Sequence, residues 1–191
     1  MQLPWPGRHW VYAALAALAV ALREGIPWDH ARAALSTAPP PPHLRIARTR
    51  EGARVIDDAY NAEPKSVKAA LDLLADTPAR RRIAVLGDML ELGRYETQAH
   101  EDVGVYAASR VDELFTFGPR GQRIAHGALA AGMDPGRVHA FPGEEALDEL
   151  VDALRALDAP ETVILVKGSR GMRMERIVDA LTQPTHPEGT A

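Results

Sequence analysis

Short apolar runs alternate with amphipathic stretches along most of the chain, from residue 54 to residue 181. Five runs have the length and composition of buried strands, and they cover residues 55–56, 83–86, 114–117, 138–141 and 163–166. Apolar residues recur at helical spacing over residues 66–75, 96–109, 122–131, 144–157 and 174–181. This repeated strand–helix alternation predicts an α/β fold in which helices cover both faces of a mostly parallel sheet.

A different pattern precedes this region. Residues 11–22 form one alanine-rich apolar run, shorter than the roughly 20 residues that a membrane-spanning helix needs. The run has the length of a signal-peptide core, but Arg23 and Glu24 follow it directly and no small-x-small cleavage site ends it. We therefore expect a buried helix in a cytoplasmic protein. Residues 29–35 predict a second short helix, with Asp29 as a candidate N-cap.

The proline run Pro39 to Pro42 fits neither a helix nor a central strand. It places a domain boundary between about residues 39 and 53, and a rigid surface loop inside one domain is the alternative. We divide the chain into a helical segment with its linker, the α/β domain and a polar tail, which cover residues 1–50, 51–183 and 184–191.

The composition narrows the classes of function. With 22 Lys and Arg against 26 Asp and Glu, the formal net charge of the 191 residues is −4, which argues against a nucleic-acid-binding surface. The absence of Cys excludes disulfides, thiolate metal sites and a cysteine nucleophile. We interpret the histidines, His100 among them, as structural or surface groups, and we expect no metal site in this chain.

Candidate sites follow the strands, because ligands of an open parallel sheet bind outside the carboxyl ends of its strands. Asp57 and Asp58 could bind a ribose diol, hold a cation or cap the next helix. The alternative is turn chemistry, with Ser66 as the helix cap. At Gly87 and Asp88 the backbone can approach a ligand while a carboxylate points into the crevice, and a solvated loop acid is the alternative.

Two glycine-containing segments follow later strands. Residues 117–121 lack the full phosphate-cradling pattern, and we interpret them as a structural turn. Residues 166–172 bring Lys167, Ser169 and Arg170 to the same edge, where the two cations could hold a carboxylate or a phosphate. The sequence contains no Gly-x-x-x-x-Gly-Lys-Ser/Thr loop, so it does not cradle a triphosphate with a P-loop of its own.

Three of these segments, in this order, resemble the C-terminal domain of the Mur ligase family. They are D-D-A-Y-N-A-E-P at 57–64, L-G-D-M-L-E-L-G at 86–93 and K-G-S-R-G-M-x-M-E at 167–175. The similarity extends from Gly7 to about Leu181. It implies that a complete ligase has a UDP-sugar domain, a central ATPase domain and a Rossmann-like C-terminal domain. The first 50 residues would then be the helical end of the central domain, and the rest the Rossmann-like domain.

The resemblance also implies a reaction of peptidoglycan synthesis, in which ATP drives the addition of D-alanyl-D-alanine to UDP-N-acetylmuramoyl-tripeptide through an acyl phosphate. By similarity, Asp58 would bind the ribose, Asn61 would lie beside it, and Arg45 would be directed to the phosphates. The residues implied on the nucleotide side are His9, Arg45, Asp58 and Asn61. Those implied on the dipeptide side are Asp88, Lys167, Ser169 and Arg170. Mg²⁺ is implied as a cofactor whose ligands lie mainly outside this chain.

The chain departs from the family pattern near the expected nucleotide. Glu63 replaces a usual Asn, Arg45 is displaced by one residue, and Trp10 and Ala13 stand where two Asn residues of the family help to recognise adenine. The P-loop and the UDP-sugar domain are missing from the sequence. We therefore expect that this chain alone does not catalyse ligation and that the missing domains act in cis or in trans.

Two other interpretations stay open. A non-catalytic Rossmann-like binding module derived from such a ligase would account for the changes at Trp10, Ala13 and Glu63. A generic phosphoacceptor or nucleotide-sensing α/β domain would use the aspartates at the strand ends, but it leaves residues 167–170 unexplained.

Overall fold

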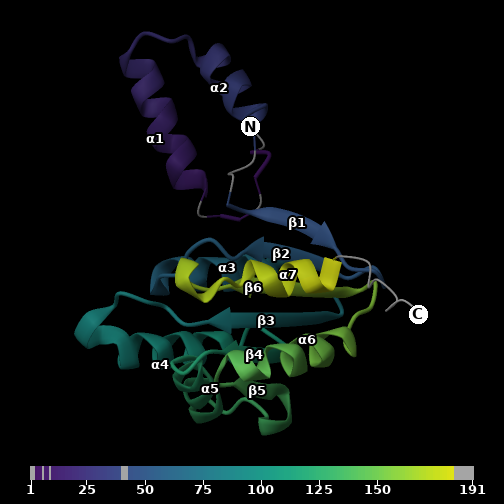
Figure 1. The fold of residues 1–191 in the computed structure, drawn as a ribbon. Coiled ribbons are helices and arrows are strands. Elements are labelled where there is room, and N and C mark those ends of the chain that lie inside the picture. Colours follow the sequence, from purple (N-terminus) through teal and green to yellow (C-terminus); the bar gives the residue numbers. More distant parts are fainter. Residues whose placement is uncertain (1–2, 6, 9, 40–42, 183–191) are drawn as a thin grey trace.

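The computed structural model describes residues 3–5, 7–8, 10–39 and 43–182, and its centre is a six-stranded sheet (Figure 1). The strands are β1 (Arg45–Arg48), β2 (Arg54–Asp58), β3 (Arg81–Gly87), β4 (Glu113–Phe117), β5 (Val138–Phe141) and β6 (Thr162–Lys167). The α-helices are α1 (Trp10–Arg23), α2 (Trp28–Ser36), α3 (Pro64–Asp76), α4 (Glu96–Ala107), α5 (Gly121–Ala130), α6 (Leu147–Arg155) and α7 (Glu175–Thr182). Short 3-10 helices are η1 (Gly93–Tyr95), η2 (Pro135–Arg137), η3 (Glu144–Ala146) and η4 (Arg170–Met172). His9, residues 40–42 of the proline run and the expected tail 184–191 lie outside the described residues.

The strand order is β1-β2-β6-β3-β4-β5, and neighbouring strands are parallel except for β1, which pairs antiparallel with β2. The mostly parallel α/β fold predicted from the sequence is confirmed. The sequence pattern did not predict β1, because most of this short edge strand is exposed and it lacks an apolar signal. Since β1 falls within the segment assigned to the linker, that segment contributes the edge of the sheet; the domain boundary itself stays a prediction.

The core lies on both faces of the sheet, and β6 is in its middle with every residue buried. Successive side chains of a strand point to opposite faces. Val163 and Leu165 accordingly pack with apolar residues of α3, α4 and α5, whereas Ile164 and Val166 pack with those of α6 and α7. This double coverage explains why β6 is an uninterrupted apolar run.

The helix predicted over residues 11–22 is present as α1, but the prediction that it is buried is wrong. Within α1 the buried residues are Ala14 and Leu18, whereas Tyr12 is 79% exposed and Val20 is also exposed. The reason is that α1 and α2 contact each other and project away from the sheet, so α2 covers a single stripe of α1 (Figure 1). Among the described residues, no helix is long and apolar enough to cross a membrane.

Two expected helix caps differ from the observed ones. Pro27 occupies the N-cap position of α2, and Asp29 lies inside the first turn. Ser66 is the third residue of α3, where its hydroxyl accepts a hydrogen bond of 3.0 Å from the backbone N–H of Glu63, the N-cap residue. This contact is one half of a capping box, and it fixes the start of α3 directly after the loop that contains Asn61.

Two glycines allow α4 and α5 to pack backbone against backbone. A Cβ atom at Gly104 would overlap the carbonyl oxygen of Ile124, and one at Gly127 would overlap the carbonyl oxygen of Glu101. Because the obstacles are backbone atoms, no side-chain rotation can relieve the overlap. The close approach of the two helices therefore requires glycine at both positions.

We expect Gly104→Ala to lower the free energy of unfolding by about 2 kcal/mol, because the added methyl group forces the helices apart. Helix propensity alone predicts the opposite sign, since Ala is the better helix former. Urea denaturation measures the difference. Gly136→Ala is the control, because its Cβ would meet only a carboxylate oxygen at 3.4 Å. Equal stability changes in the two variants would contradict the packing argument.

Candidate functional site

The carboxyl ends of β2, β6 and β3 are neighbours in the sheet, so the loops after these strands meet at one edge. These loops contain the three motifs singled out in the sequence, and the structure brings Asp58, Asp88 and Lys167 to that edge. Crevices at the carboxyl edge of an open α/β sheet are the usual ligand sites of such folds. The position of the motifs therefore supports a functional site here.

Lys167 joins the ends of β6 and β2. It is directly opposite Asp58 in the strand register, and its side chain is 3% exposed. Its Nζ lies 2.5 Å from Oδ2 of Asp58 and donates a hydrogen bond of 2.9 Å to the backbone carbonyl oxygen of Asn61. The ammonium group therefore fixes both the carboxylate and the loop that follows it.

Ser169 connects all three loops. Its backbone N–H donates to the carbonyl oxygen of Asp88 at 3.0 Å. Its hydroxyl donates to the carbonyl oxygen of Ala62 at 3.3 Å and accepts from the backbone N–H of Leu90 at 2.8 Å. The buried hydroxyl is thus bound on both sides within the chain, which makes it a structural link between the loops.

The carboxylate of Asp88, a residue that is 1% exposed, anchors the start of α5. Its Oδ1 accepts hydrogen bonds from the backbone N–H groups of Arg120 and Gly121 at 3.0 and 2.8 Å. A carboxylate is favourable at a helix N-terminus, where backbone N–H groups lack partners within the helix. The glycine-rich turn interpreted as structural is therefore the partner of Asp88.

The side chain of Arg120 extends this network to α4. Its Nη1 lies 3.4 Å from Oδ2 of Asp88, and its Nε lies 2.6 Å from a carboxylate oxygen of Glu96. The hydrogen bond with Glu96 raises the pKa of the Arg120 guanidinium, with Asp88 adding to the effect. Arg120 is therefore a fixed cation beside the site.

His100, on α4, holds the loop that follows β3 through a hydrogen bond. Its ring is fully buried, its Nε2 accepts a hydrogen bond of 3.0 Å from the backbone N–H of Met89, and its Nδ1 lies 2.7 Å from the carbonyl oxygen of Glu96. Because Nε2 is the acceptor, the ring proton is on Nδ1, which donates it to the backbone carbonyl oxygen of Glu96. The interpretation of His100 as a satisfied structural histidine is confirmed.

Two cavities open around this edge. The first, which we call the edge cavity, has a volume of about 380 Å³ and includes Asp58, Asn61 and Lys167 in its lining. The second, the arginine cavity, has a volume of about 190 Å³ and includes Arg45 and Arg170. His43 and Tyr60 line both cavities, and their rings stack with centroids 3.9 Å apart.

The two arginines of the arginine cavity are held differently. Arg45 lies 2.6 Å from Oδ2 of Asp57, and this hydrogen bond and the attraction of the carboxylate raise the pKa of Arg45. Arg170 lies 3.9 Å from Glu175, its guanidinium lies 5.7 Å from the centre of the Tyr60 ring, and its side chain is 69% exposed. The side chain of Arg45 is also 69% exposed, so the two arginines differ in how tightly they are paired rather than in exposure, and Arg170 is the less tightly held.

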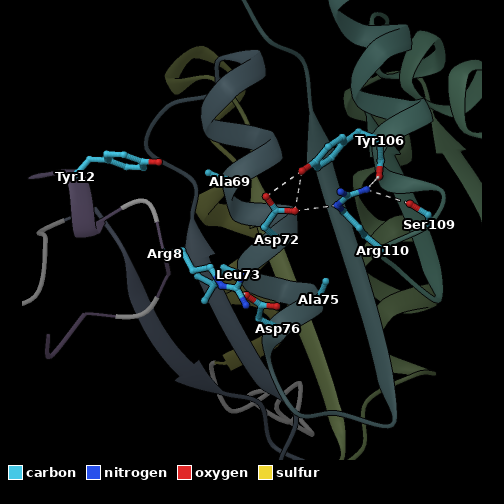
Figure 2. A pocket seen from close by; sticks show the side chains of 10 residues that line it. All are labelled: Arg8, Tyr12, Ala69, Asp72, Leu73, Ala75, Asp76, Tyr106, Ser109 and Arg110. Carbon is cyan, nitrogen blue, oxygen red and sulfur yellow. Dashed lines mark hydrogen bonds and ion pairs between the residues drawn. The ribbon is translucent and has the colours of Figure 1, made fainter. Parts of the chain in front are cut away.

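A larger cavity, of about 660 Å³, lies on the outer side of α3 and is shown in Figure 2. There Asp72 accepts hydrogen bonds from the hydroxyl of Tyr106 at 2.8 Å and from Nε of Arg110 at 2.9 Å. Burial acts to raise the pKa of Asp72, but the hydrogen bonds from Arg110 and Tyr106 outweigh it and lower that pKa. These charged groups pair with one another and none belongs to a motif, so we favour the sheet edge as the functional site.

A metal site is not evident in the part of the chain that the structure describes. No group of three or more His, Asp and Glu side chains there is arranged to hold an ion. The described residues therefore do not fit a magnesium site of their own.

Residues 44–170 match the protein-family model described as "Mur ligase, glutamate ligase domain". The chain belongs to the Mur ligase family. Of the candidate site residues, the match includes all except His9. The helix-covered, mostly parallel sheet is thus that of a Mur ligase C-terminal domain.

The similar proteins point to one branch of the family. The chain is 36% identical to the UDP-N-acetylmuramoyl-tripeptide–D-alanyl-D-alanine ligase of Bacillus subtilis strain 168 over 184 residues, which are 95% of this chain and 39% of the relative. It is 36% identical to the ligase of the same name from Escherichia coli K12 over 187 residues, 95% of this chain and 38% of the relative. The chain therefore spans less than two-fifths of the length of these relatives.

A solved structure agrees with these matches. Crystal structure I of MurF from Acinetobacter baumannii superposes with a TM-score of 0.82 at 30% identity, over 94% of this chain and 38% of that one. The Mur ligase domain of this chain is MurF-like.

The site also contains residues that the sequence patterns did not single out. Tyr60 follows Asp58 closely, and an aromatic residue at the end of a strand was a signal that could have drawn attention to it. His43 follows the proline run and gave no such signal. Lys167, predicted on the dipeptide side, lines the edge cavity beside Asp58 and Asn61, and the ligand that it faces stays a prediction.

Proposed function

We propose that this chain is the C-terminal part of an ATP-dependent ligase that adds D-alanyl-D-alanine to UDP-N-acetylmuramoyl-tripeptide. In this reaction the carboxylate of the tripeptide takes the terminal phosphoryl group of ATP, which gives an acyl phosphate and ADP. The amine of the dipeptide then displaces phosphate and forms the amide bond. The protein supplies orientation and charge stabilisation to both steps.

The observation that carries the proposal is the junction of three motif loops at one sheet edge, made by Lys167 and Ser169. It occurs in a chain that is 36% identical to the ligases named above over most of its length. The geometry supports two adjoining binding regions, because the edge cavity and the arginine cavity share the His43–Tyr60 pair.

On the nucleotide side, the carboxylate of Asp58 would accept the ribose hydroxyls, while Lys167 and Asn61 shape the loop around it. Arg45 would contact phosphate oxygens, because its hydrogen bonds to Asp57 use only two of its three nitrogens. His9 stays a prediction for this side. Magnesium would accompany the nucleotide, with ligands from outside the described residues.

On the dipeptide side, Arg170 would hold the carboxylate of D-alanyl-D-alanine, because it is exposed and its contact with Glu175 is long. The loop that contains Arg170 would be held in place by Lys167, Ser169 and Asp88, whose hydrogen bonds join it to the loops after β2 and β3. Arginine suits this role because its planar guanidinium can bind a carboxylate through two hydrogen bonds.

A chimaera tests the proposal. The 184 matched residues of the B. subtilis ligase would be replaced by those of this chain, and the rest of that ligase would supply the central and UDP-sugar domains. The chimaera should release phosphate from ATP only when both UDP-N-acetylmuramoyl-tripeptide and D-alanyl-D-alanine are present, whereas the 191-residue chain alone should not exceed background. Turnover by the chain alone, or a folded chimaera without turnover, would contradict the proposal.

In the chimaera, we expect Arg170→Ala to raise the KM for D-alanyl-D-alanine roughly tenfold, because one charge-assisted contact is lost. The KM for ATP should stay within twofold of the parent value, a margin of about 0.4 kcal/mol. Arg137→Ala is the matched control. Arg137 is an exposed arginine directly before β5, the outermost strand on the side of the sheet away from β1. A rise in the KM for ATP instead would contradict the assignment of Arg170 to the dipeptide.

The second candidate function is a non-catalytic binding module derived from such a ligase. The observation in its favour is that Trp10 lines the edge cavity, where the resemblance leads us to expect an amide side chain. Turnover by the chimaera would exclude this candidate.

A further inference from the structure

We propose that the edge cavity binds the base of the nucleotide by stacking and burial, and therefore accepts guanine nearly as well as adenine. This inference rests on the proposed function, which places a nucleotide at Asp58 and Asn61. It adds that the base is held without being identified.

The edge cavity has a polar end and an apolar end. Asp58, Asn61 and Lys167 provide a carboxylate, an amide and an ammonium group at the sheet edge. The lining then follows α3 from Ser66 to Leu73, a distance of about 10 Å along the helix axis. Along this part of α3 the lining is apolar or aromatic: Trp10, Ala69, Ala70 and Leu73. A nucleoside has the same two parts, a hydroxylated sugar and a flat ring system.

Two aromatic pairs hold the rings that line this cavity. Trp10 makes an edge-to-face contact with Trp5, with centroids 5.7 Å apart, and the indole N–H of Trp5 donates to the carbonyl oxygen of Pro39 at 2.8 Å. Tyr60 stacks on His43 at an interplanar angle of 12°. Rings that are already held in place lose little freedom when a base stacks on them. Stacking tolerates any base, because every base has a π-face.

The apolar end offers few groups that could distinguish one purine from another. Adenine and guanine differ in the donors and acceptors on their edges, so a protein must present matching groups to tell them apart. Of the four side chains in this part of the lining, three are aliphatic and the fourth, the indole of Trp10, can donate a hydrogen bond but not accept one. A pocket of this kind rejects polar analogues only weakly, whereas a hydrogen-bonding pocket rejects them by orders of magnitude.

Isothermal titration of the chimaera, which has the domains that hold the phosphates, with ADP and with GDP tests the inference. The two dissociation constants should differ by less than about tenfold, because stacking tolerates any base and the apolar lining offers few groups that match the edge of one purine only. Trp10→Ala should weaken both nucleotides by about tenfold or more, because a stacking partner is lost. Trp10→Phe should restore most of the affinity, which separates the loss of a ring from a general disturbance of α1.

Trp28→Ala is the matched control, because Trp28 is an exposed tryptophan on α2 and does not line the edge cavity. Circular dichroism of each variant reports whether the fold is intact. ADP binding that is more than about tenfold tighter than GDP binding, or unchanged affinities in Trp10→Ala, would overturn the inference and leave the proposed function standing. Binding of neither nucleotide would overturn both the inference and the proposed nucleotide site.

Discussion

Lys167→Met will lower the free energy of unfolding by roughly 3 kcal/mol, near the lower end of the range for removing one partner of a buried ion pair. Methionine retains the length and much of the apolar volume of the lysine side chain but removes the ammonium group. Asp58 then loses its partner at 2.5 Å, and the carbonyl oxygen of Asn61 loses a donor. We place the effect at the lower end because the side chain of Asp58 is 22% exposed and can recruit water.

Urea denaturation of the variant gives this difference, and Lys65→Met is its matched control. Lys65 is an exposed lysine at the start of α3, close to the same loop, so its replacement should change stability by less than about 0.5 kcal/mol. The double variant Asp58→Asn/Lys167→Met should lose less than the sum of the two single variants, because the residues contact each other. Additive losses would show that the pair does not act as a unit.

Asp88→Ala has a second large expected effect, also about 3 kcal/mol, because it removes the acceptor for two backbone N–H groups at the start of α5. The N–H groups of Arg120 and Gly121 would lose their partner in a place where Asp88 itself is 1% exposed. Arg120 would also keep only Glu96 as its carboxylate partner within the network.

Thermal unfolding followed by circular dichroism measures this change. Asp88→Asn should cost about half as much, because its amide oxygen can still accept both bonds but the negative charge that favours the helix start and the contact with Nη1 of Arg120 are lost. Asp134→Ala is the matched control, since Asp134 accepts from the backbone N–H of Gly136 in the same way but on the surface. If Asp134→Ala lost as much stability as Asp88→Ala, burial would not be the reason for the large effect at Asp88.

These two residues bear on how the site is built. Lys167 and Asp88 both have their charged groups engaged within the chain, one by Asp58 and the other by the start of α5. The side chain of Arg170, by contrast, is 69% exposed, and the neighbouring Tyr60 is 48% exposed. We therefore expect the buried charges to determine whether the edge keeps its shape, and Arg170 to determine the affinity for the dipeptide.

The sequence by itself determined which segments form strands and helices within the α/β domain. The apolar run at residues 163–166 could be recognised as a buried strand because both faces of a central strand pack against helices, and this leaves no polar alternation. The sequence also showed that the three motifs follow strands, and these motifs carried the resemblance to a ligase family. β1 was missed, because an exposed edge strand of four residues carries no apolar signal.

Only the tertiary structure decided which strand ends are neighbours. β6 is the last strand in the chain but lies between β2 and β3, so Lys167 pairs with Asp58 across 109 residues of sequence. The structure also decided that α1 is exposed, since its apolar run fits a buried helix equally well. Local patterns indicate the type of each element and which of its faces is apolar, whereas strand order and burial depend on contacts between distant segments. Such contacts leave no periodicity in a single sequence, and for that reason the buried Lys167–Asp58 pair at the centre of this site could be located only in three dimensions.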